Sequence, residues 1–220
     1  MARVVIFGVQ DFASLAHFYL KHDSEHEVVA FAVNEQYLPE GETFEGLPVV
    51  AFERVAETYD PAEFHFFAPM SHRKMNQLRA SVYAQIKEKG YRLISYVSSK
   101  ATVFPGQQIG DNCFILEDNT IQPYAVVGNN VVLWSGNHIG HHSVIKDHVL
   151  FTSHVVLSGH CTVESYSFFG VNATIKDRTH IAEGSLIAMA ATVTRDTEAW
   201  GVYKGSPAKK GEASSKDLDF

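Results

Sequence analysis

The chain has 220 residues, of which 45% are hydrophobic and 20% charged, and its net charge is −7 at pH 7. This composition is typical of a soluble globular protein with one large domain or two modest ones. Lys and Arg are scattered through an acidic chain, so we expect no nucleic-acid surface. The first apolar run is short and ends at Gly8, and no segment approaches the length of a membrane span. We therefore expect a cytoplasmic protein without membrane insertion.

The first 100 residues alternate between strand and helix patterns. Short apolar runs rich in β-branched residues predict strands at 3–8, 28–33, 64–70 and 92–97. Helical patterns between them cover residues 11–21 and the segment from Met75 to a stop at Gly90. This alternation predicts an α/β domain over 1–100 with a small, Rossmann-like parallel sheet.

A strict six-residue repeat begins at Ile109. Every sixth residue from Ile109 to Val193, fifteen in all, is large and apolar. At this composition the probability of such a run by chance is on the order of 10⁻⁵. The residue four places after each of these positions is small, and Cys113 and Cys161 fall there. We interpret both cysteines as buried thiols, neither paired in a disulfide nor acting as nucleophiles.

One long and one small residue in every six form the hexapeptide pattern. Three hexads make one triangular coil, and stacked coils form a parallel β-solenoid. The sequence therefore predicts a second domain over 101–220. Gly, Pro and Ser break the period after Trp200, and we expect the polar end of the chain to fray.

The coil of three hexads predicts which side chains stack. His141 would lie one coil from Gly159, and His142 one coil from His160, with coils about 4.8 Å apart. A base beside an open glycine amide suits acyl transfer: the base takes a proton from the acceptor and the amide stabilises the oxyanion. The alternative for any single histidine in 138–160 is a solvated turn.

The segment 131–172 resembles the catalytic segment of a group of sugar acetyltransferases that includes sialic-acid O-acetyltransferases and bacillosamine N-acetyltransferases. The resemblance implies a left-handed β-helix, an N-terminal nucleotide-sugar domain, acetyl-CoA as donor without a metal, and a homotrimer. It further implies direct acetyl transfer to a nucleotide-linked deoxyamino sugar in surface glycan biosynthesis. Because the hexads are unbroken by a long loop, we expect active sites at subunit clefts.

The same resemblance assigns roles within this segment. His141 takes the family's general-base position and Gly159 that of the glycine whose amide lies near the thioester carbonyl. His142 stands where the family has an acidic partner, and Leu150 where it often has a second histidine. These two positions depart from the family pattern.

The segment from Tyr203 to Lys209 resembles the family's closing loop, which borders coenzyme A. The resemblance implies CoA contacts from Lys204, Gly205, Pro207 and Lys209. With Lys210, these lysines form a small cationic cluster that suits the phosphates of coenzyme A.

Candidate contacts to the nucleotide sugar follow the first two predicted strands. The family usually has a Gly-rich turn after the first strand; here Gly8 remains, with Gln10 and Asp11 as further candidates. Asn34 and Glu35 partly match an acidic pair that the family places near uridine. Arg73, before the second predicted helix, is a candidate for the diphosphate.

Two other functions remain open. A zinc enzyme like the γ-class carbonic anhydrases shares the β-helix, but beyond His160 only His180 remains in the solenoid as a downstream ligand. A non-catalytic solenoid would account for Leu150 and for the loss of the acidic partner at His142.

Overall fold

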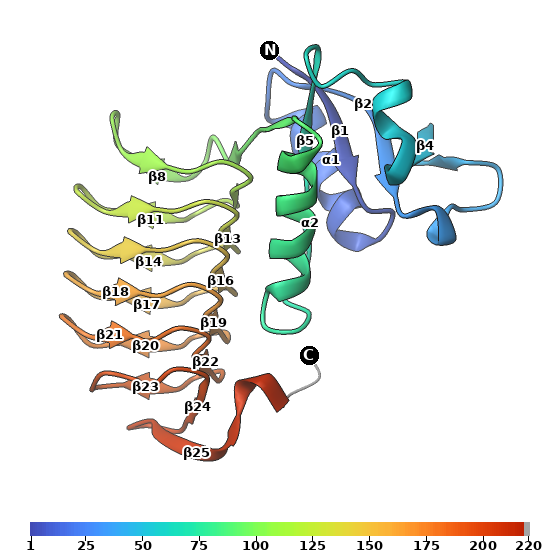
Figure 1. Cartoon of the computed structure of the whole chain (residues 1–220). Helices are drawn as coiled ribbons and strands as arrows, with labels where there is room; N and C mark the ends of the chain where they lie inside the picture. Colours follow the sequence, from blue (N-terminus) through green and yellow to red (C-terminus); the bar gives the residue numbers. More distant parts are fainter. Residues whose placement is uncertain (218–220) are drawn as a thin grey trace. The chain divides into compact units, whose positions relative to one another are not determined.

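The structure, a computed structural model, describes residues 1–217 and contains two compact units (Figure 1). Residues 1–71 and 81–96 form the first unit, and residues 72–80 join the chain from 97 onward in the second. Residues 218–220 of the predicted C-terminal tail lie outside the described residues. Within residues 1–217, no helix is both long and apolar enough to cross a bilayer.

The first unit is built on one sheet with the strand order β3-β4-β2-β1-β5-β6. Its strands are β1 (Arg3–Phe7), β2 (Glu27–Val33), β3 (Thr43–Phe44), β4 (Leu47–Ala51), β5 (Phe64–Phe67) and β6 (Arg92–Leu93). Only the pairing of β3 with β4 is antiparallel. Strand order reverses between β1 and β5, as in a Rossmann fold, so the predicted Rossmann-like sheet is confirmed.

The two α-helices follow the predicted segments closely; they are α1 (Asp11–His22) and α2 (Gln77–Glu88). Two short 3₁₀ helices, η1 (Glu35–Tyr37) and η2 (Phe52–Glu57), were not predicted. Three details of the strands also differ from the prediction. The β3–β4 hairpin was not predicted, and the predicted strand at 64–70 ends at Phe67. The predicted strand at 92–97 divides into β6 and β7 (Tyr96–Val97), and β7 pairs with the solenoid strands instead.

The second unit is a left-handed parallel β-helix with three sheets. After β7, its two-residue strands are β8 (Thr102–Val103), β9 (Gln108–Ile109), β10 (Phe114–Ile115), β11 (Thr120–Ile121), β12 (Val126–Val127), β13 (Val132–Leu133), β14 (His138–Ile139), β15 (Val144–Ile145), β16 (Leu150–Phe151), β17 (Val156–Leu157), β18 (Thr162–Val163), β19 (Phe168–Phe169), β20 (Thr174–Ile175), β21 (His180–Ile181), β22 (Leu186–Ile187) and β23 (Thr192–Val193). Each pairs in parallel with the strand three hexads away, as His138 pairs with Val156.

The six-residue repeat forms the core of this β-helix. Every repeat position from Ile115 to Val193 is at most 2% exposed, and Ile109, in the first full coil, is partly buried. The small positions are buried as well, and Cys113 and Cys161 are buried free thiols, as predicted. The long side chains fill the prism while the small ones allow the backbone to turn at its corners.

Each corner turns through one residue with a left-handed backbone. These residues recur every six positions and are Gly106, Asn112, Asp118, Tyr124, Asn130, Gly136, His142, His148, His154, His160, Tyr166, Asn172, Arg178, Gly184 and Ala190. Asn, Asp and His tolerate positive φ better than most residues. The turn geometry therefore accounts for four of the histidines between 138 and 160, but not for His141.

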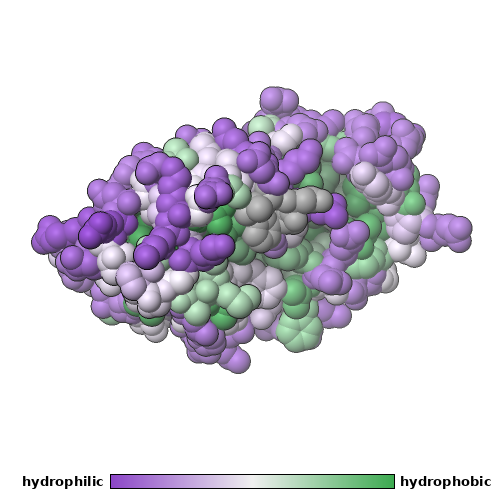
Figure 2. All heavy atoms as spheres, turned by 90° about the horizontal axis from the view of Figure 1, so that it is seen from below, coloured by the Kyte–Doolittle hydropathy of each residue, from purple (hydrophilic) through white to green (hydrophobic). Residues whose placement is uncertain are grey.

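The C-terminal segment is more ordered than predicted. Strand β24 (Gly201–Lys204) pairs with β22, β25 (Lys209–Ser214) pairs back on β24, and η3 (Ser215–Asp217) follows. The buried Ser215 hydroxyl donates to the carbonyl oxygen of Gly184 over 2.6 Å. The prediction that the end of the chain frays is therefore wrong through Asp217. On the face shown in Figure 2, hydrophilic side chains predominate and apolar ones lie among them.

Residues 72–80 are fixed on the β-helix by buried hydrogen bonds. The fully buried Arg79 guanidinium donates to the backbone and side-chain oxygens of Asn130, to Asn76 Oδ1 and to the His148 carbonyl oxygen. Asn76 in turn donates to the carbonyl oxygens of Tyr166 and Ser167. Burial lowers the pKa of Arg79 to about 9, which leaves the side chain charged at neutral pH.

Candidate active site

The structure brings His141, His142 and Gly159 together at one corner of the β-helix. His141 follows β14 by two residues and Gly159 follows β17 by two, and these strands are paired. A Cβ added to Gly159 would lie 2.9 Å from both Cε1 and Nε2 of His141. The His141 ring therefore presents its Nε2 edge to Gly159, and only glycine leaves room for it.

The backbone amide of Gly159 is open. At the same position in other hexads, the Asn129 N–H donates to Asp147 Oδ1 over 2.7 Å and the His141 N–H to Gln122 Oε1 over 2.9 Å. Within residues 1–217, the Gly159 N–H has no hydrogen-bond acceptor, and the residue is only partly buried. An N–H left without an acceptor beside an imidazole can bind an oxyanion.

His142 supports the ring of His141. The two Nδ1 atoms lie 3.0 Å apart, so one donates a proton to the other. If His141 carries the Nδ1 proton, its Nε2 lone pair faces Gly159 and can accept a proton. His142 is itself packed in a column of rings, with centroids 4.6 Å from Tyr124 and 4.9 Å from His160.

A third histidine completes a cluster at this corner. Ligand nitrogens of His141, His142 and His160 lie within 4.8 Å of one another, and all three residues are exposed. The pKa of His160 lies below its ordinary value because of lost solvation and the neighbouring Arg178, His141 and His142. Sequence reasoning placed His160 above His142 but gave it no role.

The predicted CoA-binding residues lie on and beside the β24–β25 hairpin. Lys204 pairs with Lys209 across the hairpin, Gly205 has a positive φ of 92°, and the peptide bond before Pro207 is cis. The Thr192 amide donates to the Gly205 carbonyl oxygen over 3.0 Å, which attaches the loop to β23. Strands β14, β17, β20 and β23 are consecutive in one sheet, so β23 lies three strand spacings, about 14 Å, from β14, and the loop bonds to the far side of β23.

Lys210 is not a free cation in this cluster. Its Nζ is paired with Glu198, and hydrogen bonding to that carboxylate is the main cause that raises its pKa. Lys204 and Lys209 are both exposed and remain candidates for phosphate contacts.

Five of the six predicted nucleotide-sugar residues follow β1 and β2 in the first unit. Gly8 has a φ of 114° that favours glycine, Gln10 precedes α1 and Asp11 begins it. Because β1 and β2 are parallel neighbours, their carboxyl ends meet at the edge where doubly wound sheets bind ligands.

Asn34 and Glu35 are organised by a residue that sequence reasoning missed. Glu53 accepts hydrogen bonds from Asn34 Nδ2 over 3.1 Å and from the Glu35 amide over 3.0 Å. Burial acts to raise the pKa of Glu53, but these two hydrogen bonds, a hydrogen bond from its own backbone amide and the charge of Lys89 together lower the pKa. Glu35 also forms an exposed ion pair with Arg54. No sequence signal marks Glu53, because it lies well beyond both residues in the chain, at the start of η2.

Arg73 is not grouped with these five residues. It is exposed and belongs to the stretch 72–80, whose contacts are with the second unit. The contact of Arg73 with the diphosphate stays a prediction.

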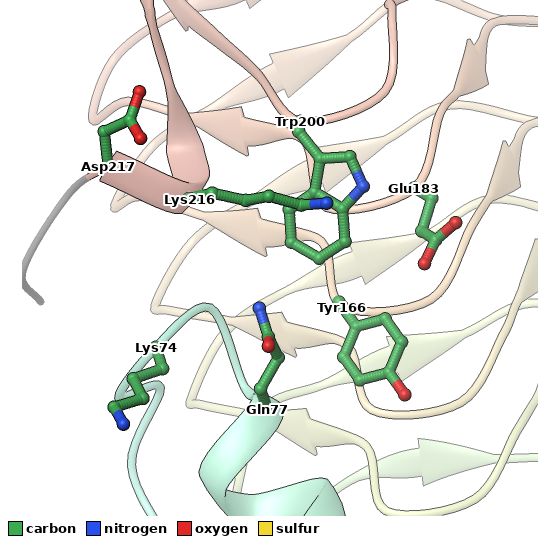
Figure 3. A pocket seen from close by; sticks show the side chains of 7 residues that line it. All are labelled: Lys74, Gln77, Tyr166, Glu183, Trp200, Lys216 and Asp217. Atoms are coloured by element: carbon green, nitrogen blue, oxygen red, sulfur yellow. The ribbon is translucent and has the colours of Figure 1, made fainter.

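A pocket of about 630 Å³ lies elsewhere on the second unit, at a different corner column from His142 (Figure 3). Its lining residues are Lys74, Gln77, Tyr166, Glu183, Trp200, Lys216 and Asp217. The Trp200 ring lies over Gly184, and the Lys216 ammonium is 4.1 Å from the ring centroid. None of the sequence-predicted site residues lines this pocket.

No protein-family model matches the chain, and no curated protein matches its sequence. Solved structures do match. One is a variant of perosamine N-acetyltransferase from Caulobacter crescentus in which asparagine replaces one histidine, solved with CoA and GDP-perosamine. Its TM-score is 0.85 at 19% identity, covering 97% of this chain and 98% of that chain. The acetyltransferase domain of PglB from Neisseria gonorrhoeae has a TM-score of 0.81 at 17% identity, covering 96% and 100%. WeeI from Acinetobacter baumannii has a TM-score of 0.79 at 18% identity, covering 96% and 100%. At these identities the comparisons establish the fold, an α/β unit followed by a left-handed parallel β-helix.

Proposed function

We propose that this protein is an acetyl-CoA-dependent acetyltransferase that acts on a nucleotide-linked amino sugar in surface glycan biosynthesis. The observation that carries the proposal is the open Gly159 amide beside the Nε2 edge of His141. The structural neighbours support it: the perosamine N-acetyltransferase was solved with CoA and GDP-perosamine, and the PglB domain with acetyl coenzyme A.

The reaction is a direct transfer. As the acceptor amine or hydroxyl attacks the thioester carbonyl, His141 Nε2 takes its proton, and the Gly159 N–H stabilises the oxyanion that forms on the carbonyl oxygen. When the tetrahedral intermediate collapses, the carbon–sulfur bond breaks and the CoA thiolate receives the proton from His141. His141 carries its proton on Nδ1 and donates it in a hydrogen bond to His142 Nδ1, so His142 replaces the acidic partner as a positioning residue.

The donor would lie along the sheet that contains β14 and β23. Lys204 and Lys209 would contact its phosphates, while Gly205 and Pro207 shape the loop that borders it. The acceptor's nucleotide would lie at the carboxyl ends of β1 and β2, near Gly8, Gln10, Asp11, Asn34 and Glu35. We further propose a cytoplasmic homotrimer with active sites in the subunit clefts.

The test is turnover with a panel of nucleotide-linked amino sugars carrying different nucleotides. Release of the CoA thiol is followed continuously, and the acetylated product is identified by mass spectrometry. We expect transfer to at least one acceptor, and His141→Ala to lower kcat by about 10²–10⁴. An unchanged rate in His141→Ala would remove this residue from the mechanism.

Two further measurements separate the alternatives. A stoichiometric metal ion retained through purification, together with hydration activity and no acetyl transfer, would favour the zinc enzyme. Absence of both turnover and thermal stabilisation by CoA would favour a non-catalytic solenoid. Sedimentation tests the assembly: an active monomer would contradict sites shared between subunits.

A further inference from the structure

The three histidines at the active corner form a nearly equilateral triangle. The ring centroids are 5.2 Å apart for His141 and His142, 4.9 Å for His141 and His160, and 4.9 Å for His142 and His160. The His141 ring stands perpendicular to the other two, which are stacked with an interplanar angle of 14°. This arrangement places three imidazoles around a common centre.

These separations match a shared metal ion. With zinc–nitrogen bonds of about 2.1 Å in tetrahedral geometry, ligand nitrogens are roughly 3.4 Å apart and the centroids of the imidazole rings roughly 5 Å apart. The ligand nitrogens here already lie within 4.8 Å of one another, and the two Nδ1 atoms of His141 and His142 are 3.0 Å apart. The stacked rings of His142 and His160 must turn about their side-chain torsions so that both lone pairs point at one ion, and both side chains are exposed.

The backbone of the β-helix positions the three histidines close together. His142 and His160 occupy the left-handed corner position of successive coils, both with a φ of 58°. The His160 N–H donates to the His141 carbonyl oxygen over 2.9 Å, which fixes the step between the coils. Ligands on such a rigid frame lose little conformational freedom when they bind an ion.

We propose that His141, His142 and His160 form a reversible binding site for a divalent transition-metal ion of the zinc type, and that the bound ion switches the transferase off. Imidazole suits Zn²⁺, Cu²⁺ and Ni²⁺ better than Mg²⁺ or Ca²⁺, which prefer oxygen.

Inhibition follows from the chemistry of one imidazole. If the ion binds Nε2 of His141, it occupies the lone pair that would otherwise take the proton from the sugar substrate. If the ion takes Nδ1, the proton of the neutral ring moves to Nε2, which then donates and no longer accepts. Either way His141 ceases to be a base. This consequence rests on the proposed function, whereas the binding itself does not.

The binding test needs no substrate. The protein is freed of metal with a chelator, and Zn²⁺ is titrated against a chromogenic zinc chelator. We expect one ion per chain for the wild type, and affinity lowered by at least about 10-fold in His160→Asn, since a ligand is lost. Asn suits the corner, because Asn112, Asn130 and Asn172 adopt the same backbone.

His154→Asn is the matched control, because His154 is an exposed corner residue outside the triangle. We expect its affinity for Zn²⁺ to equal that of the wild type. Equal affinity in the wild type and His160→Asn, or no binding by the wild type even at a large excess of ion over protein, would overturn the proposal.

The second arm measures acetyl transfer with and without Zn²⁺. We expect the ion to abolish wild-type turnover and a chelator to restore it, while His160→Asn remains active at the same ion concentration. Binding without inhibition would overturn the switch and also count against His141 as the base. Acetyl transfer by a wild-type protein that binds no Zn²⁺ would overturn the site and leave the proposed function standing.

Discussion

Gly159→Ala tests the placement of the proposed base against the proposed oxyanion amide. The added methyl group would lie 2.9 Å from Cε1 and Nε2 of His141. Ordinary carbon contacts begin at about 3.5 Å, so the ring must move by roughly 0.5 Å or more. Because the obstacle is an exposed ring and the Gly159 backbone does not require a positive φ, the fold can tolerate this movement.

The expected effect is on rate and not on stability. A misplacement of about 1 Å can lower a catalytic rate about 100-fold, so a shift of half that size predicts roughly a 10-fold loss in kcat, or about 1.4 kcal/mol. Replacing glycine with alanine where the backbone permits it stabilises a protein by about 0.4–1 kcal/mol through the unfolded chain. We therefore expect an unchanged or slightly raised melting temperature.

Two further glycines provide the comparison for a thiol-release assay combined with thermal unfolding. A Cβ at Gly140 would lie 2.5 Å from the backbone nitrogen of Gly159, so Gly140→Ala should destabilise the fold. A Cβ at Gly211 meets nothing closer than 3.5 Å, so Gly211→Ala should change neither quantity. Wild-type kcat in Gly159→Ala would refute the inferred geometry, as would a rate loss fully explained by unfolding.

Three other predictions follow from the described contacts. His142→Ala should lower kcat less than His141→Ala does, because it removes only a positioning hydrogen bond; a larger loss in steady-state kinetics would move the base assignment to His142. Arg79→Met should lower the free energy of unfolding by about 3–5 kcal/mol, because it leaves buried carbonyl oxygens without hydrogen-bond donors. Urea denaturation measures this free energy, and a change under about 1 kcal/mol would contradict the role given to Arg79. Burial, and to a lesser extent the charge of Arg79, lower the pKa of His148 in the folded protein. As the pH falls through about 6.5, His148 therefore takes up a proton in the unfolded chain before it does so in the folded protein, and the free energy of unfolding decreases. His148→Asn should weaken this decrease between about pH 6.5 and 5 by up to about 1.4 kcal/mol per pH unit; an identical pH dependence would show that His148 is not held neutral.

The β-helix was predictable because its core obeys a local rule. A large apolar residue at every sixth position, from Ile109 to Val193, determines both the period and the direction of each side chain. The step of three hexads then places His141 beside Gly159 without any knowledge of tertiary contacts. The two buried cysteines follow from the same rule, since they occupy its small positions.

The remaining features depend on contacts between distant residues. Glu53 reaches Asn34 only because η2 returns to the end of β2, and the sequence carries no mark of that return. The transfer of residues 72–80 to the second unit depends on buried hydrogen bonds from Arg79. The ordered tail depends on Ser215 meeting the Gly184 carbonyl oxygen, a contact invisible in a polar, aperiodic segment.

At the left-handed corners, the β-helix constrains the backbone more strongly than the side chain. A corner needs a backbone that tolerates positive φ, and residues as different as Asn112, Tyr124, His142 and Arg178 satisfy it. At the exposed corners the side chain is therefore nearly free to change without disturbing the core, whereas Asn112 and Asn130 are buried and hydrogen-bonded. New chemistry can arise on this scaffold one corner at a time, and whole coils can be gained or lost while the single step that joins His141 to Gly159 stays intact.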